Sequence, residues 1–312
     1  MAVTEEEVVW AYRMILGREP ESRAAIQSHL HCKNITELRA HFMNCHEFRS
    51  NMHLAQFTRR SKWVAVEVLG SFIQWVDLHD RYVSLGCLNN NYEPSETSYF
   101  ISRLGSGHTV LDIGANIGWF TLVAAKHLGP EGRIHAFEPR PETLRMLKRT
   151  IRDNGLQDRV TVWPYALADQ PGKLKLTWGK ETDNPGGSFL VNEAKFGNSH
   201  DTAEVTVAVL DELLPEITPD IIKIDVEGAE PRVFRGARKA IDRKKPPILS
   251  ELHPAQLMKV SGATSAQYID QMADYGYRCY LLENGKPTRK LQDFPNDIEQ
   301  GLISVVFEYA SQ

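Results

Sequence analysis

The sequence predicts an α/β fold in which a small helical module and a β-hairpin precede a mostly parallel seven-stranded sheet. From Thr109 onward, short β-branched runs alternate with helical stretches, which is typical of parallel sheets covered by helices on both faces. Residues 1–60 instead have the spacing of short amphipathic helices, and residues 61–94 are rich in β-branched and aromatic side chains. We therefore expect a helical N-terminal module at 1–60, a β-hairpin connector at 61–94 and the α/β domain at 95–312.

Helix-capping signals organise the first 60 residues. Thr4 followed by Glu7 makes a capping box, and apolar residues then recur at helical spacing. His41 and Cys45 lie four residues apart and could place two zinc ligands on one helix face. That pair matches no standard zinc spacing, so capped and solvated helices are the better interpretation of the module. The histidines and cysteines that crowd it are His29, His31, Cys32, His41, Cys45, His46 and His53.

The hairpin and the elements of the sheet follow in order. Two β-branched and aromatic runs, Trp63–Leu69 and Phe72–Leu78, predict the hairpin. Strands of the sheet are predicted at Thr109–Ile113, Arg133–Glu138, Val160–Trp163, Ile221–Val226, Ile248–Leu252, Arg278–Leu282 and Ile303–Phe307. Helices are predicted at 95–104, 117–128, 141–154, 231–241 and 264–275. Two extra strands, Lys173–Trp178 and Glu204–Val209, enclose a long loop at 180–203, which we expect to select the acceptor substrate.

Composition and charge exclude several classes of protein. Hydrophobic residues make up 42% and charged residues 24% of the 312 residues, which are ordinary globular values and rule out a disordered or fibrous chain. The net charge of −4 argues against nucleic-acid binding, and no apolar stretch reaches the ~18 residues that a membrane span needs. Four cysteines without a disulfide spacing, and an acidic start without a signal-peptide pattern, predict a cytoplasmic protein.

The strongest chemical signal is the run Val110–Phe120, in which an apolar strand with a carboxylate near its end leads into a small-residue turn and a helix. Ligands of open α/β sheets bind at the carboxyl ends of strands, where Gly114 and Gly118 would allow a ligand close to the backbone. The turn is not a dinucleotide fingerprint, because the third glycine of GxGxxG is missing and Asp112 would repel a pyrophosphate. An acidic residue beside the turn favours a ligand that carries an amino group.

A second acidic residue stands at the end of the next predicted strand, in Phe137-Glu138-Pro139. A carboxylate at this place can accept two hydrogen bonds from the vicinal hydroxyls of a ribose. The glycine turn and Glu138 lie about 22 residues apart along the chain. Together they predict an adenosine-type ligand.

These motifs resemble those of S-adenosylmethionine-dependent methyltransferases, with Asp112–Trp119 as motif I and Glu138 as the acidic residue that follows it. Further segments resemble the FkbM family of O-methyltransferases in particular, over about residues 75–310; they are Tyr92-Glu93-Pro94, Ile222–Glu230 and Glu251–Pro254. This resemblance implies a class I, Rossmann-like methyltransferase fold. Separately, Tyr12–Phe48 resembles a small helical domain that is often attached to glycan-processing enzymes.

The FkbM resemblance also implies the cofactor and the residues that bind it. The cofactor would be S-adenosyl-L-methionine, with Glu138 on its ribose and Ala166–Asp169 near its adenine. Many motif I sequences have glycine where this chain has Asn116, and the FkbM pattern accepts asparagine there. The cofactor-binding residues implied are Asp112, Gly114, Ala115, Asn116, Gly118, Trp119, Glu138, Pro139, Ala166, Leu167 and Asp225.

The chemical step is expected at the end of the fourth strand of the sheet. Lys223, Asp225 and Glu227 alternate with apolar residues, so they share one face of that strand or of its exit. An acidic pair at such a place is costly unless it is used or paired, whereas Glu230 could merely complement the helix that follows. The candidate catalytic residues are Asp225, Glu227, Glu251 and His253.

Methyl transfer to an alcohol needs a group that takes the hydroxyl proton, and His253 or Asp225 can serve as this base. Alternatively, Asp225, Glu227 and Glu251 could bind Mg²⁺, which would lower the pKa of the hydroxyl. The predicted function is O-methylation of a sugar, glycan or similar polar metabolite, with a polyketide-type metabolite as the alternative acceptor. Outside this enzyme class, the alternatives are a cofactor-binding module without activity and a nicotinamide-dependent dehydrogenase. We expect the 1–60 module to dock on the catalytic domain or to build a homo-oligomer contact.

Overall fold

The chain forms two compact units in the computed structural model, residues 1–62 and residues 63–312. The structure describes residues 3–16, 19–45, 62–80, 82–179, 189–191, 200–298 and 301–310. His46, His53 and most of the predicted acceptor loop at 180–203 lie outside these ranges. Among the residues that the structure describes, none of the helices has the length and apolar character needed to cross a membrane.

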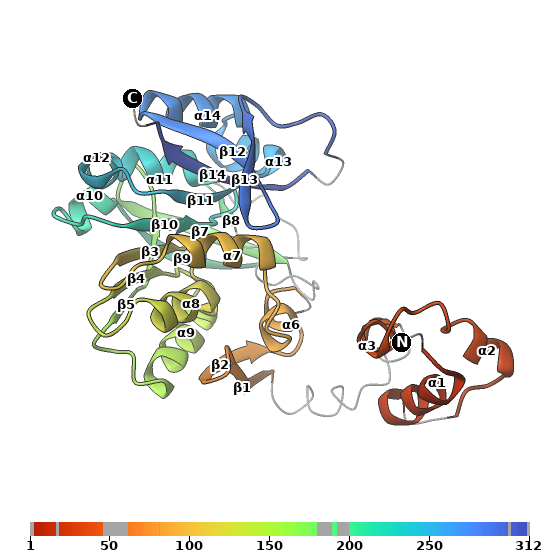
Figure 1. Ribbon diagram of the computed structural model, residues 1–312. Coiled ribbons are helices and arrows are strands. Elements are labelled where there is room, and N and C mark those ends of the chain that lie inside the picture. Colours follow the sequence, from red (N-terminus) through yellow and green to blue (C-terminus); the bar gives the residue numbers. More distant parts are fainter. Residues whose placement is uncertain are drawn as a thin grey trace. The chain divides into compact units, whose positions relative to one another are not determined.

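The N-terminal unit consists of short helices around a small apolar core (Figure 1). The first helix begins at the predicted capping box of Thr4 and Glu7, which the structure confirms. Ser22 and Asn34 cap the next two helices by accepting a hydrogen bond from the backbone three residues on. The elements are α1 (Glu5–Ala11), a π-helix (Tyr12–Leu16), α2 (Arg23–Gln27) and α3 (Ile35–Asn44). The core residues are Val3, Val8, Ala11, Tyr12, Cys32, Leu38 and Phe42.

An eight-stranded sheet forms the centre of the second unit. Its strands are β3 (Thr109–Ile113), β4 (Arg133–Phe137), β5 (Val160–Trp163), β10 (Ile221–Ile224), β11 (Ile248–Leu252), β12 (Tyr277–Glu283), β13 (Lys286–Leu291) and β14 (Ile303–Tyr309). They lie in the order β13-β12-β14-β11-β10-β3-β4-β5. The strands from β11 to β5 are parallel to one another, whereas β14, β12 and β13 pair antiparallel. This mostly parallel sheet, with β14 inserted between β11 and β12, is the class I, Rossmann-like methyltransferase arrangement, which confirms the predicted fold class.

The structure differs from the prediction at three elements of this sheet and its helices. The eighth strand, β13, was not predicted because its sequence is mostly polar and contains Pro287, features that only an edge strand tolerates. The strand predicted to reach Val226 ends at Ile224, after which the chain turns toward the end of β3. The helix predicted at 231–241 is two shorter helices that meet at Ala237.

Helices cover both faces of the sheet (Figure 1). One apolar core joins the sheet to α7, α8, α9 and a hairpin of β1 and β2, and a second core joins it to α11, α12 and α14. Burial on both sides fixes the carboxyl ends of the parallel strands, where ligands of such sheets bind. The covering elements are β1 (Trp63–Val68), β2 (Phe72–Asp77), α7 (Pro94–Arg103), α8 (Trp119–His127), α9 (Pro141–Asp153), α11 (Glu230–Gly236), α12 (Arg238–Lys244) and α14 (Ser265–Asp274).

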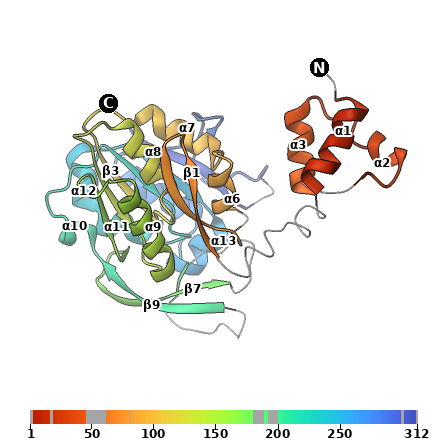
Figure 2. The same ribbon diagram turned by 90° about the horizontal axis from the view of Figure 1, so that it is seen from below.

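A second sheet contains the two extra strands predicted between 172 and 210. Its strand order is β6-β9-β7-β8, and Figure 2 shows β7 and β9 extending beside the main sheet. Its first strand, β6, follows β5 after a single residue and so continues from the ligand-binding edge of the main sheet. The strands are β6 (Tyr165–Leu167), β7 (Gly172–Gly179), β8 (Phe189–Val191) and β9 (His200–Ala208). Short helical elements complete the unit: α6 (Val83–Leu88), α10 (Leu210–Leu213), α13 (Pro254–Gln256) and a π-helix at Leu257–Ser261.

Candidate active site

The turn between β3 and α8 is held by hydrogen bonds to the end of β4. The backbone amides of Gly114 and Ala115 both donate to the Phe137 carbonyl, at 3.0 and 2.9 Å. Asn116 has a φ of +51°, a left-handed conformation that asparagine adopts more readily than most residues other than glycine. This conformation explains why either glycine or asparagine suits the position.

The glycines of the turn make room for other parts of the chain. A Cβ on Gly114, whose φ is +82°, would lie 1.9 Å from the carbonyl oxygen of Asp225. A Cβ on Gly118, with a φ of +95°, would lie 2.6 Å from the Leu147 side chain. Protein atoms therefore fill the space that a Cβ on either glycine would need. The close contact at Gly114 brings the end of β10 against the turn.

Asp112 lies beneath the turn and does not line the cavity described below. Its side chain is buried, and one oxygen accepts a hydrogen bond from Thr121 Oγ1 at 2.6 Å. Burial raises the pKa of this carboxyl, and the Lys223 ammonium partly opposes that rise. Asp112 thus ties the first turn of α8 to β3. Trp119 does not line the cavity either, and its indole donates to Thr97 Oγ1 at 3.0 Å.

Glu138 clamps the turn with both carboxylate oxygens. Oε2 accepts from the Asn116 amide at 3.0 Å, and Oε1 accepts from the Arg140 amide at 2.8 Å. Burial raises the pKa of Glu138 to about 7, although these two backbone donors and the Arg140 guanidinium favour its charged form. A carboxylate offers about four lone-pair sites, so Glu138 retains acceptor capacity for a ligand.

A cavity with about 680 Å³ of empty space, part of it continuous with solvent, lies at the carboxyl ends of β3, β4 and β10. The predicted cofactor residues that line it are Gly114, Asn116, Glu138, Pro139, Ala166, Leu167 and Asp225. The remaining four, Asp112, Ala115, Gly118 and Trp119, do not line it. Phe137, Tyr165 and Leu176 add apolar surface that we did not predict. Asp169, expected near an adenine, instead pairs with Arg232 and Arg235, at 3.3 and 2.8 Å.

Three carboxylates meet at the strand ends next to this cavity. Oxygen atoms of Glu93, Asp225 and Glu251 lie within 4.8 Å of one another. The buried Lys223 ammonium lies 3.3 Å from Asp225 Oδ2 and 4.9 Å from the centre of the Phe120 ring. Asp225 belongs to both places, because it lines the cavity and is one of the three carboxylates.

The proximity of these charges changes their proton affinities. Burial raises the pKa of Glu93 to about 7, with Lys223 lowering it and Asp225 raising it. Burial and the charges of Asp225 and Glu93 raise the pKa of Glu251 well above its usual range. Burial opposes the charge on Lys223, but the surrounding carboxylates hold its pKa above the usual value. The cluster therefore keeps its ammonium charged and resists the ionisation of Glu93 and Glu251.

The other predicted catalytic residues occupy different positions. Glu227 lines the cavity but is not one of the three grouped carboxylates. Its backbone has a φ of +52°. Burial and the charge of Asp225 raise the pKa of its carboxyl to about 8. Glu230 is buried and accepts from the backbone amides of Val226 and Gly228 at 3.1 and 3.4 Å, which is a structural role. His253 follows β11 and precedes α13, outside the cavity lining, and its buried Nδ1 has no hydrogen-bond partner in the described part of the chain.

Glu93 was not predicted as a site residue. It occupies the N-cap position of α7 in a left-handed conformation, with a φ of +42° and no capping hydrogen bond from its side chain. The Thr97 hydroxyl links this segment to α8, since it donates to the Tyr92 carbonyl at 2.9 Å and accepts from Trp119. The only sequence signal was the Tyr92-Glu93-Pro94 segment, whose resemblance to the FkbM family named no role for its acidic residue.

The family is settled by a match to the methyltransferase FkbM domain over residues 112–279, more than half of the chain. The chain belongs to the FkbM methyltransferase family. The matched segment begins at Asp112 of the turn and includes Glu138, the Asp225 segment and Glu251. The predicted family is thereby confirmed.

Individual relatives agree with this assignment. The chain is 32% identical to methyltransferase sdnD of Sordaria araneosa, over 44% of this chain and 63% of that protein. It is 28% identical to the 31-O-demethyl-FK506 methyltransferase FkbM of Streptomyces tacrolimicus, over 48% of this chain and 67% of that protein. The aligned part thus spans a little under two thirds of the first relative. A crystal structure of methyltransferase FkbM from Methylobacillus flagellatus covers 70% of this chain and 48% of its own, at 20% identity and a TM-score of 0.43, too distant to add to the assignment.

Proposed function

We propose that this FkbM-family chain is an S-adenosylmethionine-dependent O-methyltransferase acting on a hydroxyl of a sugar, a glycan or a similar polar metabolite. The observation that carries the proposal is the position of Asp225, which lines the cavity together with Glu138 and is also a member of the carboxylate cluster. A donor in the cavity and an acceptor at the cluster would meet at Asp225. Holding two reactants together in this way is a large part of what such an enzyme must do.

The residues that line the cavity suit the proposed cofactor chemically. Glu138 can accept from ribose hydroxyls with the lone pairs that its two backbone donors leave free. Ala166 and Leu167 offer apolar surface for an adenine, and Asp225 offers negative charge to a cationic ligand. When bound, S-adenosylmethionine supplies a methyl group on positively charged sulfur.

Glu93 and Asp225 are the groups best placed to take the acceptor proton. A general base is most effective when its pKa lies near the working pH, and Glu93 has a pKa of about 7. Lys223 orients Asp225 through their ion pair and supplies positive charge inside the cluster, so the proposed proton transfer needs no Mg²⁺. His253 remains the second candidate base, because its buried Nδ1 has no partner among the residues described.

Single substitutions with an acceptor panel test this function. We expect Glu93→Gln and Asp225→Asn to lower kcat by ~10²–10⁴, the usual effect of losing a general base, and His253→Ala to do so if it is the base instead. Glu93→Gln and His253→Ala should leave cofactor affinity within a few-fold. Glu131→Gln, which changes an exposed carboxylate, is the matched control and should keep full activity. Full activity of all three variants would remove the catalytic roles, and cofactor binding without turnover on any hydroxyl acceptor would favour an inactive binding module.

A polyketide-type acceptor is the second candidate. The Streptomyces tacrolimicus relative is named for methylation of 31-O-demethyl-FK506, and it shares 28% identity with this chain. The same panel separates the two candidates, since it compares free sugars and glycans with hydroxylated polyketides. Mass spectrometry of the methylated product identifies the position of the new methyl group.

A further inference from the structure

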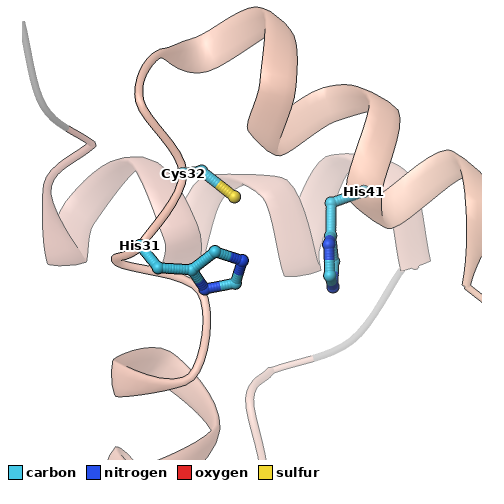
Figure 3. A group of neighbouring side chains, drawn as sticks. All are labelled: His31, Cys32 and His41. Atoms are coloured by element: carbon cyan, nitrogen blue, oxygen red, sulfur yellow. The ribbon is translucent and has the colours of Figure 1, made fainter.

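A cluster of histidine and cysteine side chains in the N-terminal unit has no part in the proposed methyl transfer. His31 and Cys32 lie in the turn after α2, and His41 lies on α3. One nitrogen of each imidazole and the Cys32 sulfur all lie within 4.8 Å of one another. Figure 3 shows the two rings and the sulfur directed toward a shared space.

The separation and chemistry of these atoms suit a transition-metal ion. Zinc bonds of ~2.3 Å to sulfur and ~2.0–2.1 Å to nitrogen place tetrahedral ligand atoms roughly 3.3–3.6 Å apart. The observed atoms lie within 4.8 Å of one another without a bound ion, so side-chain rotations would have to bring them to this spacing. Imidazole and thiolate are the donors that zinc prefers, whereas Mg²⁺ and Ca²⁺ prefer oxygen.

His31 is already oriented as a metal ligand. Its Nδ1 lies 2.8 Å from the Ser28 carbonyl oxygen. A carbonyl only accepts hydrogen bonds, so Nδ1 carries the ring proton and Nε2 presents its lone pair. Metal-bound histidines usually hold their second nitrogen in this way, which fixes the ring and strengthens the ligand.

His29 provides a second, independent sign of an unfilled site. Its ring centre lies 5.0 Å from that of His41, and its buried Nδ1 has no hydrogen-bond partner in the described ranges. Its other nitrogen lies 3.3 Å from the Tyr12 hydroxyl.

We propose that His31, Cys32 and His41 bind one zinc ion, with His29 or a water molecule at the fourth position. On binding, the Cys32 thiol releases its proton to solvent as the zinc–sulfur bond forms. The ion would stabilise a unit whose apolar core is small, as structural zinc does in other small domains. The sequence suggested a different pair, His41 with Cys45, but Cys45 is the C-cap residue that follows α3 and is not a member of this cluster.

Zinc titration of the full chain tests the site. The chelator-treated protein should bind about one Zn²⁺ per chain, measured by competition with a chromophoric chelator and by metal analysis after gel filtration. Removing a ligand should weaken binding more than the ~10–100-fold typical of lost supporting contacts, so Cys32→Ser and His41→Ala are each expected to lower affinity at least 100-fold. Cys45→Ser, which removes a neighbouring thiol outside the cluster, is the matched control and should bind zinc as the unmodified chain does.

Cobalt provides a readout that does not depend on the variants folding. Co²⁺ added to the unmodified chain should give the near-ultraviolet band of a cobalt–thiolate bond, and Zn²⁺ should displace it. Absence of that band overturns the proposal, as does zinc affinity that is the same in Cys32→Ser and in the unmodified chain.

Discussion

Replacing Glu138 with glutamine tests the cofactor assignment, because the change keeps the side-chain shape and removes its charge. In the structure, the two carboxylate oxygens accept from the Asn116 and Arg140 amides. Glutamine has one carbonyl oxygen and one amide nitrogen, so one of these backbone donors would face another donor. The nitrogen also cannot accept from a ribose hydroxyl, so the variant loses at least one hydrogen bond to the proposed cofactor.

The size of the effect follows from the energy of charge-assisted hydrogen bonds. Such a bond contributes ~1.5–3 kcal/mol, which corresponds to a roughly 10- to 150-fold increase in Kd for each one lost. Glu138→Ala removes both oxygens and should weaken binding at least as much. It also leaves two backbone amides without their acceptor, and each buried unsatisfied group costs about 1–3 kcal/mol of stability.

Calorimetric titration with S-adenosylmethionine and S-adenosylhomocysteine measures the effect. The free-protein pKa of Glu138 is about 7, so the unmodified chain should bind more weakly as the pH falls below 7, when protonation competes with the ribose hydroxyls. Glu138→Gln should lack this pH dependence. Asp169→Asn is the matched control, because Asp169 pairs with two arginines outside the cavity lining and should not affect affinity. Unchanged affinity in both folded Glu138 variants would refute the cofactor assignment.

Four other perturbations have defined outcomes. The pKa of Glu227 is about 8 in the folded chain and near 4.5 in the unfolded chain, so between these values the folded state binds the proton more tightly. The free energy of unfolding of the unmodified protein should therefore fall from pH 5 to pH 8, relative to that of Glu227→Gln. Urea unfolding at both pH values measures this, and an equal stability difference at each would contradict it. Lys223→Met leaves the carboxylate cluster without its ammonium and should cost ~3–5 kcal/mol, with Lys223→Arg less severe in the same unfolding assay. Mg²⁺ added to the dialysed enzyme should not stimulate methyl transfer, and stimulation would favour the metal alternative. Removing residues 1–60 should leave a folded domain with unchanged cofactor affinity but slower acceptor methylation or a smaller oligomer. If the mass from light scattering and the methylation rate both stay the same, the N-terminal unit has neither role.

Buried parallel strands could be predicted from the sequence because their apolar runs are nearly continuous. The predicted bounds of Thr109–Ile113, Val160–Trp163 and Ile248–Leu252 match the structure for this reason. The same property hides the direction of individual side chains, since both faces of such a strand are buried. The sequence therefore located Asp112 at the turn but could not show that its side chain lies beneath it against Thr121.

The carboxylate cluster depends on tertiary contacts that one sequence does not display. Glu93 precedes the sheet and Asp225 lies near the end of its fourth predicted strand, and nothing in their local sequences shows that they meet. Glu93 reaches Asp225 because α7 packs beside α8, where the Trp119 indole donates a hydrogen bond to the Thr97 hydroxyl. Spacing along the strand favoured Glu227 as the partner of Asp225, but the strand ends at Ile224, and the positive φ of Glu227 breaks the alternation on which that prediction depended.

The raised pKa values of Glu93, Glu227 and Glu251 have two causes in common, which are burial and repulsion by the negative charge of Asp225. Among the residues that the structure describes, the Lys223 ammonium is the positive charge paired with this cluster, so the acidic groups are in excess and retain protons near neutral pH. Under the proposed function, Asp225 would face a positively charged donor before methyl transfer and a neutral product after it. The cationic donor would therefore favour ionised carboxylates at the moment when a base is needed. Loss of that charge after transfer would favour reprotonation of the carboxylates and weaken binding of the cofactor product. Under the proposed function, the charge balance of the cluster would thus couple proton acceptance to the stage of the reaction.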